Sequence, residues 1–377
     1  MRKLSDYQFH EQIGMSYSWL LYKAVSILNQ EQVLIKTSRN QASPHAKAEL
    51  IHEYYLLKEL DLTGGVLKPV ALKKGKEIPY LVMEFFDGIP LSDWMKGNPA
   101  FDVNRYLKMA LQLTSILSAV HQHHIIHKSL HLDNILYDND TNQLKLTGFH
   151  QSTTLSKETP QADITPYQIG EVISVSPEQT GRMNRAIDYR TDLYSLGVLF
   201  YQLATGRAPF EGKGQAEIIH AHLAQTAVSP DQINPALPTI VSSIIMKLLA
   251  KDPENRYQST YGLKKDLEKC FALFHSEQEV DVFPLAEHDV SPMLEKPNKL
   301  YGRGGSELAL LMESFERVQH GRPGLVLIPG SAGIGKTALV QHLHTPLLHK
   351  KGYFISGKFV QFQKHTPYAP IIELFAP

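Results

Sequence analysis

The spacing of apolar residues changes along the chain, and this change constrains the fold more than any other feature. Residues 9–38 alternate between apolar and polar positions, as half-buried strands do, and the polar turn Asn29-Gln30 divides them. Residues 46–60 instead repeat apolar positions every three or four residues, with Leu50 and Leu57 on one face, as a helix does. A β-meander followed by one helix is therefore predicted for the start of the chain.

Further elements complete two lobes of unlike character. Strand candidates around residues 66–72 and 80–86 give a five-stranded first lobe that ends at the turn Asp87-Gly88. From residue 101 onward the apolar spacing is mostly helical. Helices are predicted from residue 101 and at 191–205, 214–224, 238–250 and 260–273, with a hairpin near 134–147. The expected fold class is a two-lobed α+β domain.

Composition narrows the functions that this chain can have. Its 377 residues suffice for about two domains, and 43% apolar with 20% charged residues is typical of a folded protein. The 38 basic and 38 acidic side chains cancel, so no positive field attracts nucleic acid. The longest apolar stretch, 193–203, is too short to span a membrane, and the opening residues lack the apolar core of a secretory signal. The single cysteine, Cys270, fits a reducing compartment, so we expect a cytoplasmic protein with no nucleic-acid partner and no membrane insertion.

A phosphate-binding motif lies near the C-terminal end. The sequence GSAGIGKT, residues 330–337, matches G-x-x-x-x-G-K-[ST] without a mismatch. The apolar run 325–328 before it is predicted to be a buried strand, and the residues from Ala338 are predicted to be a helix whose first amides hold phosphates. The expected nucleotide-binding residues are Gly330, Gly333, Gly335, Lys336 and Thr337. ATP is the predicted ligand, with Mg²⁺ on the Thr337 hydroxyl, and the alternative is a glycine-rich turn that binds nothing.

The acidic motif that nucleotide hydrolysis also needs is missing from the 40 residues (377 minus 337) after Thr337. We therefore expect residues 299–377 to form the N-terminal part of a P-loop ATPase domain that binds ATP without hydrolysing it. Residues 275–298 mix acidic residues and prolines with no sustained period, and are predicted to be a linker. The preceding domain then spans residues 1–274.

Ordered landmarks run through this first domain. Lys36 ends the strand-like VLIK, and Glu53 lies on the helix that follows. Further along, Glu178 closes SPE, Asp192 begins a long apolar helix, and Arg256 lies in KDPENRYQS. In order and spacing these landmarks resemble a eukaryotic-type serine/threonine protein kinase domain, and the resemblance covers nearly the whole stretch. It implies that Lys36 contacts nucleotide phosphates while paired with Glu53, and that Glu178 and Arg256 form a buried pair.

The residues that would perform the chemistry depart from this family. Its H-R-D-L-x-x-x-N motif appears as HKSLHLDN, which keeps Asn134 but has Ser129 in place of the aspartate that accepts the substrate's proton. Its D-F-G motif appears as GFH, with Gly148 in place of the metal-binding aspartate. Loss of the base alone lowers the rate by about 10²- to 10⁴-fold, and loss of the metal ligand weakens charge neutralisation further. We therefore expect no intact catalytic residue.

Three other sequence features concern the nucleotide pocket that the kinase resemblance implies. The glycine loop keeps only Gly14, with Ser16 and Trp19 at the other two glycine positions. Leu34 stands where kinases normally have an alanine against the adenine ring, and its bulk is expected to fill the pocket. Asp133 is the nearby carboxylate that could replace the missing base, which requires a change in backbone geometry.

The order of the segments carries a second resemblance. A kinase-like domain with SPEQTGRMNR after its activation segment, a linker, and a phosphate-loop module that opens with LYGR resemble the N-terminal part of bacterial multidomain signalling proteins. In that family a serine/threonine kinase-like domain is fused to an AAA-type ATPase and to sensor and histidine-kinase modules, which implies protein partners in a signalling pathway.

Two functions stay open at this point. The first is a catalytically degenerate kinase-like domain, regulatory or scaffolding, attached to an ATP-binding module. The second is an active serine/threonine kinase that phosphorylates proteins with non-standard catalytic residues. The sequence indicates neither the partner protein, nor the input signal, nor the oligomeric state.

Overall fold

A computed structural model shows the fold of most of the chain. It describes residues 3–4, 6–15, 19–39, 44–59, 64–74, 79–97, 101–154, 172–183, 185–275, 283–290, 306–319, 321–330 and 336–341. The chain divides into two compact units. The first is made of Met1–Thr159, Pro166–Thr180 and Ala186–Pro292, and the second contains Met293–Pro377 with two short earlier segments. Both predicted lobes lie in the first unit.

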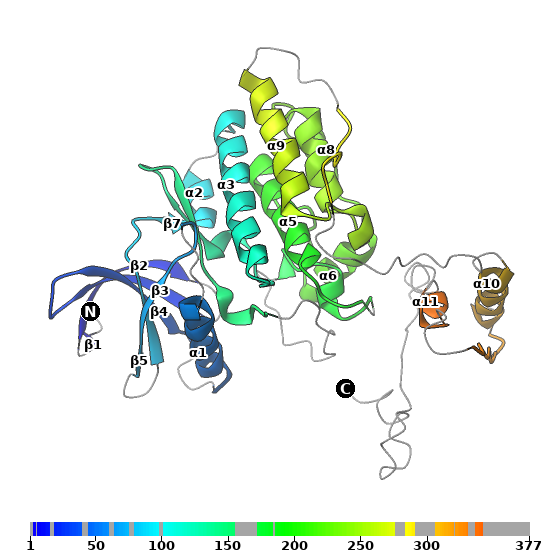
Figure 1. The fold of residues 1–377 in the computed structure, drawn as a ribbon, viewed down its shortest axis with the longest axis horizontal. Coiled ribbons are helices and arrows are strands. Elements are labelled where there is room, and N and C mark those ends of the chain that lie inside the picture. The colour runs from blue at the N-terminus through cyan, green and yellow to red at the C-terminus, as the bar shows by residue number, and fades with distance from the viewer. Residues whose placement is uncertain are drawn as a thin grey trace, which may run out of the picture. The chain divides into compact units, whose positions relative to one another are not determined.

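The first lobe is an antiparallel sheet with one helix (Figure 1). Its strands are β1 (Lys3–Leu4), β2 (Tyr7–Met15), β3 (Trp19–Ser26), β4 (Gln32–Ser38), β5 (Pro69–Lys74) and β6 (Pro79–Met83), in the sheet order β1-β2-β3-β4-β6-β5. The predicted turn joins β3 to β4, with Gln30 in the left-handed conformation at φ 59°. Helix α1 (Pro44–Glu59) buries Leu50 and Leu57, as predicted from their spacing. The five predicted strands are present, and β1 adds a short sixth.

The second lobe is mainly helical, as predicted. Its helices are α2 (Leu91–Gly97), α3 (Val103–Gln122), α5 (Arg190–Thr205), α6 (Gln215–Ala224), α7 (Pro230–Ile233), α8 (Thr239–Leu248) and α9 (Thr260–His275). The predicted hairpin consists of β8 (Ile135–Asp138) and β9 (Gln143–Leu146), and β7 (Ile89–Pro90) pairs with β8. Helix α5 packs against α3 and α8 (Figure 1) and is buried along nearly its whole length, which agrees with its apolar residues from Leu193 to Leu203.

Part of the predicted linker packs on the helical lobe. Residues 283–290 are described, and the ring of Phe283 is buried with Lys269 Nζ 4.0 Å from its centroid. Asp289 accepts hydrogen bonds from the backbone N–H of Gln258 at 2.5 Å and from the hydroxyl of Ser259 at 2.7 Å, next to the start of α9. This segment therefore belongs to the first unit, while the rest of the predicted linker lies outside the described residues.

The second unit contains helices α10 (Ser306–Gln319), which the amphipathic pattern predicts, and α11 (Lys336–Gln341). The prediction of a buried strand at 325–328 is wrong for this structure, because these residues form no strand and Leu325 and Leu327 are 85% and 80% exposed. A strand is stabilised by hydrogen bonds to neighbouring strands, and the described residues of this unit contain no strand with which 325–328 could pair. The helix predicted from Ala338 is described only as far as Gln341.

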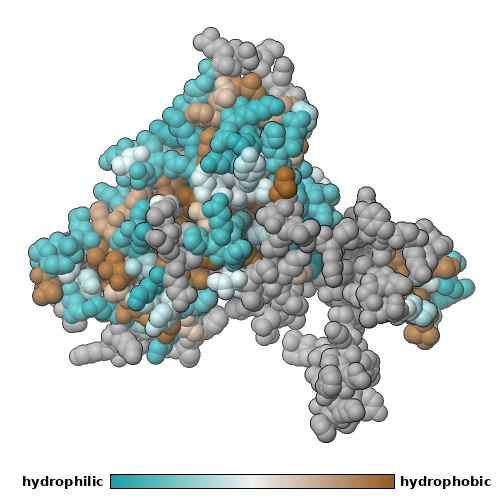
Figure 2. All heavy atoms as spheres, viewed as in Figure 1, coloured by the Kyte–Doolittle hydropathy of each residue, from teal (hydrophilic) through white to brown (hydrophobic). Residues whose placement is uncertain are grey.

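In the described part of the chain, no helix combines the length and the apolar character that crossing a membrane requires. The face drawn in Figure 2 is largely hydrophilic, with apolar residues in small groups. Leu28, at the turn between β3 and β4, is 95% exposed. Small apolar groups of this kind are ordinary on protein surfaces.

Candidate functional site

Lys36 and Glu53 form a buried ion pair between strand β4 and helix α1. Lys36 Nζ donates to Glu53 Oε2 at 2.6 Å, and the two residues are only 4% and 0% exposed. The other carboxylate oxygen, Oε1, accepts the backbone N–H of Phe149 at 3.2 Å. Helix α1 is thereby tied to the sheet and to the short helix η2 (Phe149–Gln151). The structure thus brings together the two residues that the kinase resemblance pairs.

The indole of Trp19 covers this ion pair. Trp19 begins strand β3 and is 4% exposed. Its ring centroid lies 5.0 Å from Lys36 Nζ and 5.5 Å from the ring centroid of His150. A cation next to an indole face is stabilised by the ring quadrupole. The Lys36 ammonium is therefore engaged by a carboxylate and an aromatic ring of the protein, at the position where the resemblance expects nucleotide phosphates.

Asn134, which the HKSLHLDN segment shares with the kinase motif, is held by its neighbours. It ends the short helix η1 (Leu132–Asn134), and its Nδ2 donates to the carbonyl oxygen of Ser129 at 2.9 Å and to Ser129 Oγ at 3.2 Å. The same nitrogen lies 2.8 Å from Nε2 of His131. Burial lowers the pKa of His131, so the ring is neutral and Nε2 accepts this bond. The Asn134 amide is thus turned toward the catalytic loop.

Gly148 leaves no room for a side chain. It adopts the left-handed conformation, φ 89°, directly before η2. A Cβ atom at this position would lie 2.3 Å from Asn134 Nδ2 and 2.4 Å from Asn134 Cγ, which is closer than real Cβ atoms approach. The metal-binding aspartate of the kinase family therefore does not fit here unless Asn134 moves.

Two other predicted residues are engaged elsewhere. The Asp133 carboxylate accepts a hydrogen bond from the hydroxyl of Ser92 on α2, and its second oxygen lies 3.8 Å from His131 Nδ1. Leu34 is completely buried in the apolar core and is opposite Met83 in the pairing of β4 with β6. The Asp133 carboxylate is therefore bonded to Ser92 and does not supply a base next to Ser129.

Asp192, in the first turn of α5, fixes the backbone of the catalytic loop. Its carboxylate accepts the backbone N–H groups of His127 and Lys128, each at 2.8 Å, and lies 2.9 Å from Nε2 of His121. Burial raises the pKa of Asp192, but the bonds from the two histidines outweigh burial, and the pKa is lower than usual. His127 is fully buried, which lowers its pKa to about 4, and its ring packs 4.5 Å from that of Phe149. The loop is therefore ordered without a catalytic aspartate.

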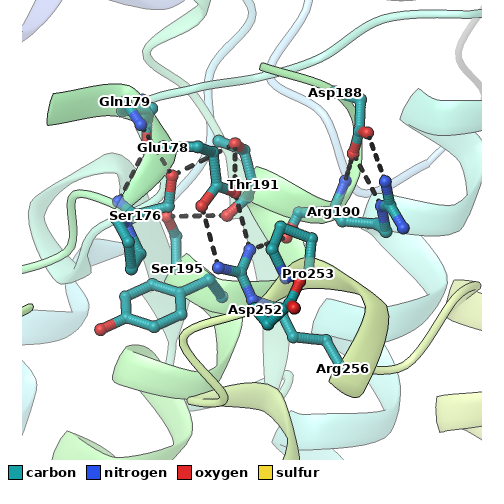
Figure 3. Close-up of polar contacts among 12 residues, drawn as sticks. Ser176, Glu178, Gln179, Asp188, Arg190, Thr191, Ser195, Asp252, Pro253 and Arg256 are labelled. Carbon is teal, nitrogen blue, oxygen red and sulfur yellow. Dashed lines mark hydrogen bonds and ion pairs between the residues drawn. The ribbon is translucent and has the colours of Figure 1, made fainter. Parts of the chain in front are cut away.

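Glu178 and Arg256 form the second buried ion pair (Figure 3). Arg256 donates from Nη1 to Glu178 Oε1 at 2.7 Å and from Nη2 to Oε2 at 2.9 Å. The Thr191 hydroxyl donates to Oε1 at 2.8 Å, and Arg256 also donates to the carbonyl oxygens of Arg190 and Lys251. Burial raises the pKa of Glu178, but Arg256 outweighs burial and the pKa is lower than usual. The pair joins the SPE segment to the residues before α9, as the sequence predicts.

The phosphate loop is described in part. Lys336 Nζ donates to the carbonyl oxygen of Gly330 at 2.7 Å, so both ends of the motif lie together. Gly333 and Gly335 lie outside the described residues, as does the side chain of Thr337. The predicted phosphate and magnesium contacts of this loop therefore stay predictions.

Comparison with known proteins agrees with this geometry. Residues 7–267 match the protein kinase domain family, and residues 299–377 match the AAA ATPase domain family. The chain belongs to the protein kinase domain family. Its relatives include Hybrid signal transduction histidine kinase G of Dictyostelium discoideum, which is 32% identical over 360 residues, 72% of this chain and 10% of that protein.

Two relatives of the kinase domain carry serine/threonine kinase names. Serine/threonine-protein kinase PrkC of Bacillus subtilis is 33% identical over 195 residues, which cover 52% of this chain and 29% of that protein. Serine/threonine-protein kinase PknB of Mycobacterium tuberculosis is 30% identical over 190 residues, 50% of this chain and 30% of that protein. The chain therefore spans less than a third of each of these three relatives.

Both domain families imply ATP and Mg²⁺ as ligands. At position 148 the described residues do not fit Mg²⁺, because Gly148 offers no carboxylate. Asn134 keeps its amide oxygen for a metal, since its hydrogen bonds to Ser129 and His131 are all made by Nδ2. Lys36, which the kinase resemblance expects at the nucleotide phosphates, is buried beneath Trp19. The kinase family membership and the chemistry of this pocket therefore disagree.

Two side-chain contacts of this site are not predicted from the sequence. His131 is three residues before Asn134 and accepts its amide, and Trp19 contacts a residue far along the chain, His150. The HKSLHLDN segment could have indicated the first contact, since the side chain of His131 is long enough to reach Asn134. No sequence pattern indicates the second, because it depends on the docking of the two lobes.

Proposed function

We propose that the kinase domain of this chain is catalytically degenerate and acts as a regulatory or scaffold domain attached to an ATP-binding AAA module. The observation that carries this proposal is the filling of the Gly148 side-chain space by Asn134. A kinase holds Mg²⁺ with the aspartate at one of these positions and the asparagine at the other. In this chain the aspartate ligand is absent, and Asn134 would be the single family ligand left to hold the metal.

Two further observations support the same proposal. Ser129 replaces the proton-accepting aspartate, and a neutral hydroxyl is no base at pH 7. The ion pairs Lys36–Glu53 and Glu178–Arg256, by contrast, are complete. Their role here is to hold the lobes and the SPE segment in place, which is what a binding domain needs from a kinase fold.

The second candidate is an active serine/threonine kinase with non-standard catalytic residues. It is favoured by the intact Lys36–Glu53 pair and by the names of the relatives PrkC and PknB. In this candidate Asp133 replaces the missing base and Mg²⁺ is bound without an aspartate at position 148. Both changes require the catalytic loop to rearrange, because Asp133 is bonded to Ser92.

For the second unit we propose that ATP and Mg²⁺ bind at the phosphate loop through Gly330, Gly333, Gly335, Lys336 and Thr337. The hydrogen bond from Lys336 Nζ to the carbonyl oxygen of Gly330 supports this, since it brings the lysine to the first glycine of the motif. The domain boundaries that we propose are 1–274 for the kinase domain, on which linker residues 283–290 pack, and 299–377 for the part of the AAA module in this chain.

At the level of the cell we propose a cytoplasmic bacterial signalling protein with protein partners. The domain order and the similarity to a Dictyostelium relative named as a hybrid signal transduction histidine kinase support the signalling role, and the relatives PrkC and PknB, which are from bacteria, support a bacterial source.

Phosphotransfer and nucleotide binding by the full chain test the proposal. The chain is incubated with radiolabelled ATP, Mg²⁺ and a protein substrate, and ATP binding is titrated by calorimetry for the wild type, Lys36→Met and Lys336→Ala. We expect no incorporation of label, ATP binding that survives Lys36→Met, and loss of binding in Lys336→Ala. Incorporation that disappears in Lys36→Met would show instead that the second candidate is correct.

A further inference from the structure

A cavity lies in the helical lobe of the kinase domain, in residues that have no role in the site described above. Its volume is ≈ 300 Å³, and it is formed by α2, the start of α3, the end of α5 and the end of α7. Ligand pockets in proteins start at about this size. All the residues that line it are described and belong to the first unit.

The lining of the cavity is mainly apolar and aromatic. Met95, Phe101, Met109, Leu203 and Ile233 contribute side chains to its wall. An apolar wall favours a ligand with a hydrophobic body, because that body leaves water on binding. An engineered cavity of about 150 Å³ holds benzene, so this one suits about twelve non-hydrogen atoms.

Most polar groups of the wall are bonded within the protein, and the exceptions are Arg105 and the hydroxyl of Tyr106, which is buried and has no hydrogen-bond partner among the described residues. Asp102 accepts the backbone N–H of Asn104 at 2.9 Å as the N-cap of α3. Thr205 donates to the carbonyl oxygen of Tyr201 at 2.8 Å, and Asn234 donates to that of Ala204 at 2.7 Å. These groups are already satisfied and do not require a ligand.

Arg105 is the cation of the wall. Its guanidinium carbon lies 5.7 Å from the ring centroid of Trp94, which also lines the cavity, and no carboxylate among the described residues lies within 4.0 Å of it. Arg105 is partly buried, so its stem is held, and its charge lies next to the Trp94 ring without a carboxylate partner in the described part of the chain. A planar guanidinium with free donors binds a carboxylate in two parallel hydrogen bonds.

From these observations we propose that this cavity is a binding site for a small amphipathic carboxylate. The apolar or aromatic body fills the cavity, and the carboxylate pairs with Arg105 at its edge. None of the residues that line this cavity belongs to the Lys36–Glu53 site or to the phosphate loop, so binding in the cavity needs neither ATP nor phosphotransfer.

The test uses 4-phenylbutyrate, which has twelve non-hydrogen atoms, about the number that the cavity holds. The neutral alcohol 4-phenylbutan-1-ol is the matched ligand control. Binding to the full chain is followed by calorimetry and by the fluorescence of Trp94 in a Trp19→Phe background, which leaves Trp94 as the single tryptophan. We expect 4-phenylbutyrate to bind with a Kd on the order of 1 mM and to change the Trp94 emission, with the alcohol binding more weakly.

Arg105→Gln tests the role of the charge, and Lys108→Gln is the matched control, because Lys108 is an exposed cation on the same helix that does not line the cavity. We expect Arg105→Gln to weaken 4-phenylbutyrate binding about tenfold or more, to leave the binding of the alcohol unchanged, and Lys108→Gln to change neither. Circular dichroism melting verifies that both variants fold. Equal binding of acid and alcohol to the wild type, equal loss in both variants, or no binding of the acid would each overturn the proposal.

Discussion

Asn134 and Gly148 share one space next to the catalytic loop: a Cβ atom on Gly148 would lie 2.3 Å from Asn134 Nδ2. In the kinase family these two positions carry the side chains that hold Mg²⁺. Here the side chain of Asn134 occupies the space beside Gly148, and its Nδ2 is bonded to Ser129 and His131. Replacing Gly148 with aspartate would therefore not by itself rebuild a metal site.

Gly148→Ala should destabilise the kinase domain by about 3 kcal/mol or more, because the left-handed backbone and the contact with Asn134 both oppose a Cβ atom. The measurement is urea unfolding of the full chain followed by tryptophan fluorescence. Both tryptophans, Trp19 and Trp94, lie in the first unit, so the signal reports on that unit alone.

Gly64→Ala is the control for this prediction. Gly64 has φ 74° and no atom within 4 Å of an added Cβ, so it carries the backbone penalty of about 1–2 kcal/mol without the collision. Asn134→Ala removes the colliding atoms, and Gly148→Ala should be less destabilising in that background. Equal effects of the Gly148 and Gly64 substitutions would show that the two side chains do not compete for space.

Trp19→Ala should make the amine of Lys36 more reactive toward an acylating reagent. Lys36 is only 4% exposed, and its ammonium lies beneath the indole of Trp19. We therefore expect the reagent to reach this amine only when Trp19 moves. Peptide mass spectrometry of the full chain during timed labelling measures the rate. Lys68, which is exposed, is the internal control and should be labelled at the same rate in both proteins. An unchanged Lys36 rate would mean that the indole does not limit access.

Arg256→Ala should destabilise the first unit by about 3–5 kcal/mol, because it leaves the buried Glu178 carboxylate without its partner. Lys265→Ala is the contrasting variant, since it removes one member of the exposed pair Lys265–Glu268 and should change stability little. Urea unfolding midpoints compare the two. If both variants unfold at the wild-type midpoint, the Glu178–Arg256 pair does not stabilise the fold.

The stability of the first unit should fall as the pH is lowered from 7 to 4. Burial lowers the pKa of His127 from 6.5 to about 4 and that of His222 to about 3, so the unfolded state binds these protons first. The stability that the neutral rings contribute is complete above pH 6.5 and is lost as the pH falls toward the pKa values that these histidines have in the folded protein. The free energy of unfolding should fall by about 1.4 kcal/mol per histidine per pH unit in this range. Urea unfolding at a series of pH values measures the slope.

Two histidine variants separate this effect from general acid sensitivity. His222→Phe should reduce the slope between pH 6 and pH 4, because one titrating group is removed from the core. His123→Gln should leave it unchanged, because His123 is exposed at the end of α3. A stability that does not vary between pH 7 and pH 4.5 would contradict the assignment of neutral, buried rings.

The boundaries of the elements show where local sequence information ends. The helices of the second lobe lie within a few residues of their predicted ranges, because their apolar spacing is long and regular. The strand predicted at 66–72 instead occupies Pro69–Lys74, since its register is set by pairing with β6 rather than by its own residues. Residues 325–328 are apolar enough for a strand, but no partner strand lies beside them in the described part of the chain.

The sequence by itself determined the two lobes, the pairing of Lys36 with Glu53 and of Glu178 with Arg256, and the absence of the two catalytic aspartates. Periodicity and motif spacing carry that information along a single segment of chain. Only the tertiary structure decided that Trp19 covers Lys36, that Asn134 takes the space beside Gly148, and that residues 283–290 pack on α9. Each of these depends on which side chains from distant segments compete for one volume, and close packing settles that competition only when the whole domain is folded.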